Sequence, residues 1–301
     1  MTDILCLGEP LVEFVRLDDG TYKRGFGGDT SNAAIAAARQ GASVGFITAL
    51  GADRFGDSII DLWTQEGVDT AHVLRDPDAP TGIYFVDPDP AGRFFTYYRA
   101  GSAASQLQGS DLPDAAIKSA RCLHLSGITL AVSEALRAAS HEAMRMAVEA
   151  GVAVSLDTNL RLKLWDIGTA SDETQRAARL ARIVVTSVDD SEHLLGQTDP
   201  AHIADIYRDL GAEIVLVTMG AEGCHLATDV HQVHIPAAPS TPIDSTGAGD
   251  SFAGAFLAWW LETGDTKLAA HCAAKVAAGT VSGLGAVDPI PRREQVVTEP
   301  F

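Results

Sequence analysis

A glycine-rich turn that opens an apolar helix is the stretch of this sequence best suited to chemistry. It reads Asp244-Ser-Thr-Gly-Ala-Gly-Asp-Ser-Phe252, and an apolar run follows at once. A helix that starts on glycines turns unpaired N–H groups outward at the positive end of its dipole, so we expect Gly247, Ala248 and Gly249 to bind an anion. Asp250 falls in the first turn beside them. Its carboxylate could cap the helix, or it could accept a proton from a hydroxyl that attacks a phosphoryl group held there.

The same stretch resembles the signature of the ribokinase-like (PfkB) carbohydrate kinases, D-T-x-G-A-G-D-x-F. A second family signature lies near the N-terminus, Gly27-Gly-Asp-Thr-Ser-Asn-Ala-Ala34, and the resemblance covers essentially the whole chain. The stretch is not a Walker loop, because no Gly-Lys-Ser/Thr follows, and it lacks the third spaced glycine of a dinucleotide fingerprint. The resemblance implies a phosphotransferase with an alcohol group as acceptor and with ATP and Mg²⁺ as cofactors.

The resemblance also implies which residues handle the phosphoryl group and the nucleotide. Asp250 would be the base, and the N–H groups of residues 247–249 would hold the migrating phosphate. The family's Asn-x-x-Glu motif, which helps to organise magnesium and phosphate, is matched by Ser187-Val-Asp-Asp190. Asp190 keeps the charge on a shorter arm, so it is either a metal ligand or a solvent-exposed carboxylate at a helix start. The implied nucleotide-binding positions are Ser187, Thr218, Gly220 and Gly223.

The tripeptide Tyr97-Tyr98-Arg99 bears on the substrate. An arginine guanidinium is suited to bidentate recognition of a carboxylate, whereas a neutral sugar needs no cation. Arg161 ends the stretch Asp157-Thr-Asn-Leu-Arg161 and could supply a second cation, although that stretch also occurs in fructokinases. With Gly8-Glu-Pro10, these features resemble the 2-keto-3-deoxygluconate kinases. The residues that this resemblance places around the sugar acid are Gly27, Gly28, Asn32, Tyr84, Tyr97, Arg99, Ile128 and Arg161.

Three functions therefore fit the sequence. The first is an ATP-dependent sugar-acid kinase that phosphorylates the terminal hydroxyl of 2-keto-3-deoxygluconate. The second is a fructokinase or ribokinase of the same fold, and Arg99 could then be an exposed charge of the lid. The third is a non-catalytic, sugar-responsive binding protein, against which the intact Gly247-Ala-Gly-Asp250 argues.

Strand-like and helix-like segments alternate along the chain, which predicts an α/β fold with a doubly wound, mostly parallel sheet and helices on both faces. Apolar runs at 122–126 and 214–218 are among the predicted strands. An alanine-rich helix is predicted from Ser31 to Gln40, with Thr30 or Ser31 as its cap. The resemblance implies that residues 1–301 form a single ribokinase-like kinase domain.

A small second sheet is predicted beside the main one. Two β-rich runs flank the turn Pro88-Asp-Pro-Ala-Gly92 and predict a hairpin. With residues 11–22 this hairpin would form the small β-sheet lid that the family places over its sugar site, at about 11–25 and 81–100. A hairpin that stands off the main sheet needs a surface to pack on, so we expect a homodimer or higher homo-oligomer formed through the lid.

Composition and charge exclude several classes of protein. The chain is 46% hydrophobic and holds no apolar run of about 18 residues, so we expect no membrane span. Because no basic stretch precedes the first apolar residues, we expect no signal peptide and a cytoplasmic protein. A formal charge of −18 argues against nucleic acid and anionic membranes as partners, which leaves the sugar acid and ATP.

Overall fold

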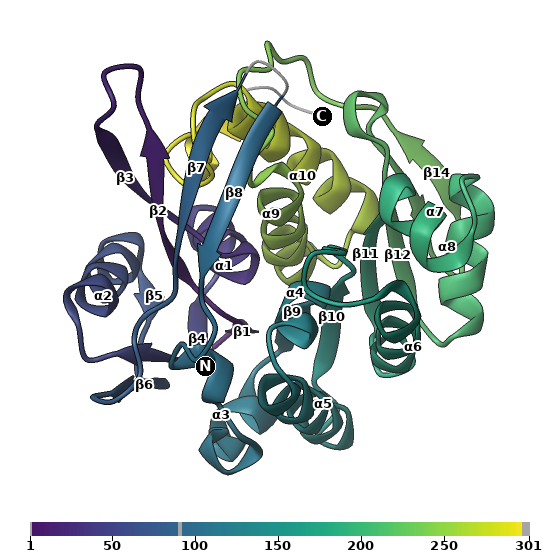
Figure 1. Cartoon of the computed structure of the whole chain (residues 1–301). Helices are drawn as coiled ribbons and strands as arrows, with labels where there is room; N and C mark the ends of the chain where they lie inside the picture. The colour runs from purple at the N-terminus through teal and green to yellow at the C-terminus, as the bar shows by residue number, and fades with distance from the viewer. Residues whose placement is uncertain (1, 90–91, 297–301) are drawn as a thin grey trace.

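The fold is built on a ten-stranded, mostly parallel sheet (Figure 1). The computed structural model describes residues 2–89 and 92–296. The strands of the large sheet are β1 (Ile4–Leu7), β4 (Val44–Gly51), β5 (Val68–Asp69), β6 (Val73–Asp76), β9 (Cys122–Ser126), β10 (Ala153–Asp157), β11 (Ile183–Ser187), β12 (Ile214–Thr218), β13 (Cys224–Ala227) and β14 (Gln232–Ile235). They lie in the order β14-β13-β12-β11-β10-β9-β1-β4-β5, and β6 also pairs with β4. The pairings from β12 to β5 are parallel, and β13 and β14 run antiparallel to their neighbours.

Helices cover both faces of this sheet. One face carries α1 (Asp29–Arg39), α2 (Arg54–Glu66), α9 (Ala248–Thr263), α10 (Thr266–Val281) and α11 (Arg293–Val296). The other face carries α3 (Asp114–Ser119), α4 (Gly127–Ala131), α5 (Glu134–Glu149), α6 (Ile167–Ala178), α7 (Val188–Leu195) and α8 (Pro200–Asp209). Strand β1 shows the alternation that feeds both cores, because Ile4 and Cys6 pack into the first and Leu5 and Leu7 into the second. The predicted fold class is confirmed.

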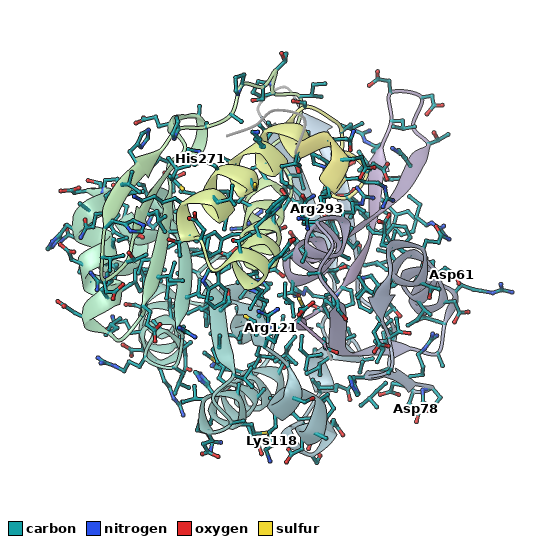
Figure 2. All side chains as sticks on the ribbon, turned by 180° about the vertical axis from the view of Figure 1, so that it is seen from behind. Asp61, Asp78, Lys118, Arg121, His271 and Arg293 are labelled. Atoms are coloured by element: carbon teal, nitrogen blue, oxygen red, sulfur yellow. The ribbon has the colours of Figure 1, made fainter. Side chains whose placement is uncertain are left out.

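Short 3₁₀ turns and surface charges complete this layer structure. The 3₁₀ turns lie at Ala104–Gln106, Gly109–Asp111 and Gly220–Glu222. Figure 2, which views the molecule from behind, shows α9 and α10 covering the sheet, with Arg293 beside them. Arg293 forms an ion pair of 2.6 Å with Glu262 of α9.

In the described parts of the chain, no helix has the length and apolar character needed to cross a membrane.

A separate four-stranded sheet, called the smaller sheet below, stands to one side of the large sheet (Figure 1). Its strands are β2 (Leu11–Arg16), β3 (Tyr22–Gly27), β7 (Ile83–Asp89) and β8 (Gly92–Tyr98), in the order β3-β2-β7-β8. The predicted hairpin is therefore present, and the tip of its turn, at 90–91, lies outside the described residues. Glu13 and Tyr84 share one face of the sheet, while Phe14 and Phe85 share the other. The rings of Phe14 and of Phe55 in α2 pack edge to face, with their centroids 5.8 Å apart.

The start of α1 differs from the prediction. The helix begins at Asp29, so Thr30 and Ser31 lie inside its first turn and do not cap it. Gly28 is the N-cap residue, with a φ of 101° that favours glycine. The hydroxyl of Ser31 instead accepts a hydrogen bond of 3.0 Å from the indole nitrogen of Trp63 in α2. A glycine start leaves no capping side chain in the sequence, which is why the boundary was misplaced.

Helices α1 and α9 cross closely enough to bring their N-terminal turns together. A Cβ atom added to Gly254 would lie 2.0 Å from the backbone oxygen of Ala33, so glycine is required at this crossing. Gly247 begins α9 with a φ of 78°, in the left-handed region. As a result, Asn32 of α1 lies within 2.8 Å of Asp250 of α9.

Candidate active site

The carboxyl ends of the parallel strands meet at one edge of the large sheet, and polar residues gather there. Asp157 ends β10, Ser187 ends β11 and Thr218 ends β12. Doubly wound sheets bind their ligands outside this edge. Helix α9 begins at the same edge, because Asn159, two residues after β10, donates a hydrogen bond of 3.2 Å to Asp250.

Asp250 is held by two asparagine side chains from different elements. The Nδ2 of Asn32 donates to its Oδ2 at 2.8 Å, and the Nδ2 of Asn159 donates to its Oδ1 at 3.2 Å. Asn159 has a left-handed φ of 30°, which is uncommon for a residue with a side chain, and its amide also donates to Asp29 at 3.2 Å. Within the described part of the chain, no side chain caps α9 by a hydrogen bond. The carboxylate is therefore not a helix cap.

The electrostatics of Asp250 suit a proton acceptor. Burial is the largest effect and, with the negative charge of Asp29, raises the pKa of Asp250 from 3.8 to about 6. The amides of Asn32 and Asn159 and the charge of Arg161 act in the opposite direction. A base with this pKa is ionised at neutral pH and binds a proton more readily than an ordinary carboxylate. The geometry and the charge thus allow Asp250 to take a proton from a hydroxyl.

The turn before α9 is fixed from both sides. Asp244 accepts hydrogen bonds from the backbone nitrogen and the hydroxyl of Thr246, at 3.0 and 2.7 Å. Its second oxygen accepts a hydrogen bond of 2.9 Å from the nitrogen of Gly285. A Cβ atom on Gly247 would lie 2.9 Å from the backbone oxygen of Ala286. The backbone that opens α9, with its outward N–H groups, is therefore held in place before any ligand binds.

Asp190 reaches the same edge from the first turn of α7. Ser187 caps this helix by accepting a hydrogen bond of 2.9 Å from the nitrogen of Asp190. The Oδ2 of Asp190 accepts hydrogen bonds from the hydroxyl of Thr158, at 2.9 Å, and from the nitrogen of Leu160, at 3.1 Å. Asp190 is half-buried and bonded to the end of β10. Asp190 is therefore not a solvent-exposed carboxylate at a helix start, which was one of the two interpretations that the sequence allowed.

Four carboxylates lie near one another at this edge. Burial raises the pKa of Asp157 well above its ordinary range, and the charges of Asp250, Asp190 and Asp29 raise it further, while Arg161 partly offsets them. Such a concentration of negative charge favours a bound cation. Among residues 2–89 and 92–296, however, no three His, Cys, Asp or Glu side chains are grouped to hold a metal. The donor set fits a Mg²⁺ that keeps phosphate and water ligands, and it does not form an all-protein cage.

The predicted nucleotide-binding positions lie on two neighbouring strands. Ser187 and Thr218 are paired in the register of β11 and β12. Gly220 and Gly223, at the 3₁₀ turn after β12, have φ values of 56° and 99°. A Cβ atom on Gly223 would lie 2.1 Å from the backbone oxygen of Ile235, so the turn can pack against β14 only with glycine there. The structure thus brings all four positions to the same corner of the sheet edge.

One face of the smaller sheet presents aromatic and acidic groups toward this edge. The hydroxyl of Tyr84 donates a hydrogen bond of 2.6 Å to Glu13, and the Tyr84 ring stacks on Tyr97 with centroids 5.4 Å apart. A Cβ atom on Gly27 would lie 2.3 Å from the Tyr84 hydroxyl oxygen. Burial raises the pKa of Tyr84, and the charge of Asp250 adds a smaller contribution. The smaller sheet and the start of α9 therefore face each other.

Arg99 directly follows β8 and is half-buried. Its side chain is 11% exposed, and its Nη2 forms an ion pair with Oε2 of Glu9. The other oxygen of Glu9 accepts a hydrogen bond of 2.5 Å from the hydroxyl of Ser102. The guanidinium carbon of Arg99 lies 5.7 Å from the centre of the Tyr97 ring. Arg99 is therefore a half-buried cation with an internal partner, and it is not the exposed charge of the lid that the sequence also allowed.

The remaining predicted substrate positions surround these groups. Arg161 is exposed, and its charge acts to lower the pKa of both Asp250 and Tyr97, so it lies near both the start of α9 and the smaller sheet. Ile128 is half-buried in α4, directly after β9. At Gly28 a Cβ atom would lie 2.6 Å from the backbone oxygen two residues after β1. The eight predicted substrate positions thus come from the smaller sheet, from α1 and α4, and from the loops that follow β8 and β10.

Comparison with known proteins gives this geometry a family. Residues 1–293 match the family described as pfkB family carbohydrate kinase. This chain belongs to the pfkB family. A 2-dehydro-3-deoxygluconokinase from Thermoproteus tenax is 34% identical to this pfkB kinase, over 97% of this chain and 92% of the relative. The predicted family, and with it a phosphotransferase that acts on an alcohol group of a sugar, is confirmed.

Two solved structures resemble this pfkB kinase along its whole length. A PfkB protein from Polaromonas sp. JS666 matches it with a TM-score of 0.89 at 30% identity, over 98% of this chain and 99% of the other. A fructokinase from Xylella fastidiosa, solved with bound ATP, also has a TM-score of 0.89, at 28% identity over 98% and 97% of the two chains. These likenesses confirm the fold. The description of the first structure gives no substrate, and the second structure contains ATP.

Three residues of the site were not among those predicted for this pfkB kinase. Asn159 orients Asp250, Asp157 adds a carboxylate at the end of β10, and Glu9 pairs with Arg99. Each stands at or just after the end of a buried strand, which is the position where α/β sheets place ligands, so a positional signal was available. The pairing between Glu9 and Arg99 had no such signal, because it depends on how the smaller sheet meets β1.

Proposed function

We propose that this pfkB kinase transfers a phosphoryl group from ATP to the terminal hydroxyl of 2-keto-3-deoxygluconate. The observation that carries the substrate is Arg99, a buried guanidinium beside Tyr97 on the side of the smaller sheet that faces Asp250. A guanidinium pairs well with a carboxylate, and a neutral sugar offers it no charged partner. The Thermoproteus tenax relative is named as a 2-dehydro-3-deoxygluconokinase, and 2-dehydro-3-deoxygluconate is another name for 2-keto-3-deoxygluconate. That name supports this choice of substrate.

Asp250 is the general base in this proposal. It accepts the proton of the terminal hydroxyl as that oxygen attacks the transferred phosphorus, and it later returns the proton to solvent. Asn32 and Asn159 each bond one carboxylate oxygen and so fix its orientation. The N–H groups of residues 247–249 stabilise the charge on the phosphoryl oxygens at the start of α9.

ATP lies along β11 and β12 in this proposal, against Ser187, Thr218, Gly220 and Gly223. The ATP-bound structure of the Xylella fastidiosa fructokinase supports ATP as the donor. Asp190 is the residue that would hold Mg²⁺, together with phosphate oxygens and water, and bound Mg²⁺ would neutralise charge on the phosphates. Because the donor is ATP, we place the enzyme in the cytoplasm.

The sugar acid lies between the two sheets, with its carboxylate toward Arg99 and its terminal hydroxyl toward Asp250. Arg161 supplies a second cation from the end of β10. The Oδ1 of Asn32 is buried and has no hydrogen-bond partner within the described residues, so it is available to accept a hydrogen bond from a sugar hydroxyl. The other contacts proposed for the sugar come from Gly27, Gly28, Tyr84, Tyr97 and Ile128.

A fructokinase or ribokinase is the second candidate, because Glu9 already supplies a carboxylate to Arg99. If that pair stays intact when substrate binds, the cation gains little from a sugar acid, and a neutral sugar fits equally well. The third alternative, a non-catalytic binding protein, is disfavoured by the oriented Asp250 and the fixed turn before α9.

Substrate preference tests the proposed function. The measurement is kcat/KM with ATP and Mg²⁺ for 2-keto-3-deoxygluconate, fructose and ribose. We expect the sugar acid to exceed both neutral sugars by about 10-fold or more, since a charge-assisted hydrogen bond is worth roughly 1.5–3 kcal/mol. A preference for fructose or ribose would select the second candidate, and no ATP consumption with any sugar would select the third.

We propose that the smaller sheet is a lid that closes when the sugar acid binds. Closure would exclude water and so prevent wasteful hydrolysis of ATP. Backbone amides of β7 and β8 are therefore expected to exchange hydrogen more slowly at saturating sugar acid, whereas those of β5 should not change. Equal exchange in β7 and β8 with and without the ligand would contradict a mobile lid.

We propose that two copies of the chain pair through the outer face of the smaller sheet. That face carries an aromatic cluster of Phe14, Tyr22, Phe85 and Tyr98, in which Tyr98 is 63% exposed. A partner would shield it from water. Tyr98→Glu is expected to convert a dimer, measured by light scattering after gel filtration, into a monomer. Val148→Glu, a matched change of an exposed apolar residue on α5, should leave the mass unchanged; a monomeric wild type would contradict the proposal.

A further inference from the structure

The pair of Glu9 and Arg99 joins the two sheets, and the proposed mechanism gives Glu9 no role. Glu9 follows β1 of the large sheet, and its side chain is 1% exposed. One oxygen contacts Nη2 of Arg99, and the other accepts the 2.5 Å hydrogen bond from Ser102. Both partners lie after β8, at the foot of the smaller sheet. A buried carboxylate of the protein is thus already paired with the guanidinium that the carboxylate of a sugar acid would bind.

The charges around Glu9 make its ionised form depend on Arg99. Burial, the largest effect, raises the pKa of Glu9, while Arg99 and the Ser102 hydroxyl bring it part of the way back and the charge of Asp29 raises it again. Within the described residues, the charges that act most strongly on Glu9 are one cation, Arg99, and one anion, Asp29. A second carboxylate at Arg99 would share the guanidinium and add a like charge nearby. When two carboxylates share one site, the pKa of one of them is raised, so that carboxylate binds a proton at a higher pH.

We propose that Glu9 is a specificity-determining residue, which holds Arg99 in the empty site and takes up a proton from solvent when the carboxylate of the sugar acid binds to Arg99. The inference rests on the proposed function, because it requires an acidic substrate at Arg99. It explains why the site carries a buried internal carboxylate beside its substrate cation. Small anions gain little at a guanidinium that is already neutralised, whereas the sugar acid also gains the contacts of its hydroxyls.

The sign of the pH dependence follows from this uptake. A complex that holds one more proton than its separate components loses affinity as pH rises, by up to about tenfold per pH unit. The loss falls between the pKa of Glu9 in the empty site and its higher value beside the bound carboxylate. A neutral sugar leaves the pair of Glu9 and Arg99 intact, so its affinity should not show this loss.

Titration calorimetry of the full-length protein without ATP tests the proposal. The sugar acid, 2-keto-3-deoxygluconate, is titrated at several pH values, each in two buffers of different ionisation enthalpy, which gives the number of protons taken up. The matched variant is Glu9→Gln, which keeps an oxygen to accept from Ser102 and removes the charge. Asp250 also titrates, near pH 6, but it is present in both proteins, so the difference between them isolates Glu9.

We expect wild type to take up a proton that Glu9→Gln does not. Glu9→Gln should bind the sugar acid about as well as wild type at the low end of the pH range and more tightly at the high end.

A lower affinity of Glu9→Gln at every pH would show that Glu9 has a structural role only. Equal proton uptake in the two proteins would overturn the inference about Glu9 without contradicting the proposed substrate. If Glu9→Gln does not fold, wild type still decides: the same pH slope for the sugar acid and for fructose overturns the inference. If wild type does not bind the sugar acid at any pH, both the proposed substrate and this inference are wrong.

Discussion

Asp250→Asn is expected to lose turnover by about 100- to 10,000-fold while the protein still folds and binds sugar. The reason is the position of the carboxylate in the first turn of α9, where its two oxygens are held by Asn32 and Asn159. Asparagine keeps the shape of the side chain and removes its ability to accept a proton. The measurement is kcat with saturating ATP and sugar acid, with the sugar affinity measured separately by calorimetry.

The fold of this variant should survive, for two reasons. The buried Oδ1 of Asn32 has no hydrogen-bond partner within the described residues, so the Asn32 amide can turn over and accept from the new amide at 250. Burial also raises the pKa of Asp250 above its value in the unfolded chain, so its ionisation lowers the free energy of unfolding as pH rises from about 3.8 to about 6. That loss remains at neutral pH. An uncharged residue avoids that cost, and the free energy of unfolding at neutral pH should not fall.

The same pKa predicts the pH profile of the wild type. The base is active when ionised, so kcat/KM should rise with pH through about 6 and then level off. Asp61→Asn is the matched control, because Asp61 is an exposed residue on α2 at the outside of the molecule (Figure 2). It should keep wild-type kcat. A folded Asp250→Asn enzyme with near-normal kcat would remove Asp250 from the mechanism.

Arg99→Ala is expected to reduce kcat/KM for 2-keto-3-deoxygluconate by about 10- to 100-fold and to affect fructose far less. The guanidinium is buried beside Tyr97, where a charge-assisted hydrogen bond to a carboxylate is strong. A neutral sugar makes no such bond and so loses little when the guanidinium is removed. Both substrates are measured in both proteins, so that the ratio of the two losses is the readout.

Two controls separate recognition from damage to the smaller sheet. Arg16→Ala removes another arginine of that sheet, whose ion pair of 2.8 Å with Asp87 is half-exposed, and it should leave the substrate ratio unchanged. Glu9→Gln with Arg99→Ala removes both partners of the buried pair and so avoids leaving one charge unpaired. Equal losses for sugar acid and fructose in Arg99→Ala would mean that Arg99 holds the sheet in place and does not select the substrate.

Particular elements show how far sequence reasoning reaches into this fold. Strands β9 and β12 have the predicted bounds, because each is an apolar run that ends on a hydroxyl residue. Helix α8 was not predicted, although Asp199 caps it and Pro200 stands at its first position, a start signal that was overlooked. Helix α10 was also missed, since its many alanines give it no clear apolar stripe.

The site divides in a similar way. Asp250 and Asn32 belong to two separate motifs, and their contact follows from the crossing of α1 and α9 that Gly254 permits. The resemblance could therefore supply them before the structure was known. Glu9 and Arg99 lie in different sheets, and their contact depends on how the smaller sheet is seated, which no local pattern records. Because of that contact, Arg99 is one member of a neutral ion pair and not an isolated cation.

The most direct test of the account is the identity of the phosphorylated product. The enzyme is incubated with ATP, Mg²⁺ and 2-keto-3-deoxygluconate, and the product is examined by proton-coupled phosphorus NMR. A phosphate on the terminal, primary alcohol couples to the two protons of its CH₂ group and gives a triplet, which is the result we predict. A doublet from a secondary carbon would place Asp250 at a different hydroxyl. Inorganic phosphate without any phosphate ester would contradict the proposed transfer altogether.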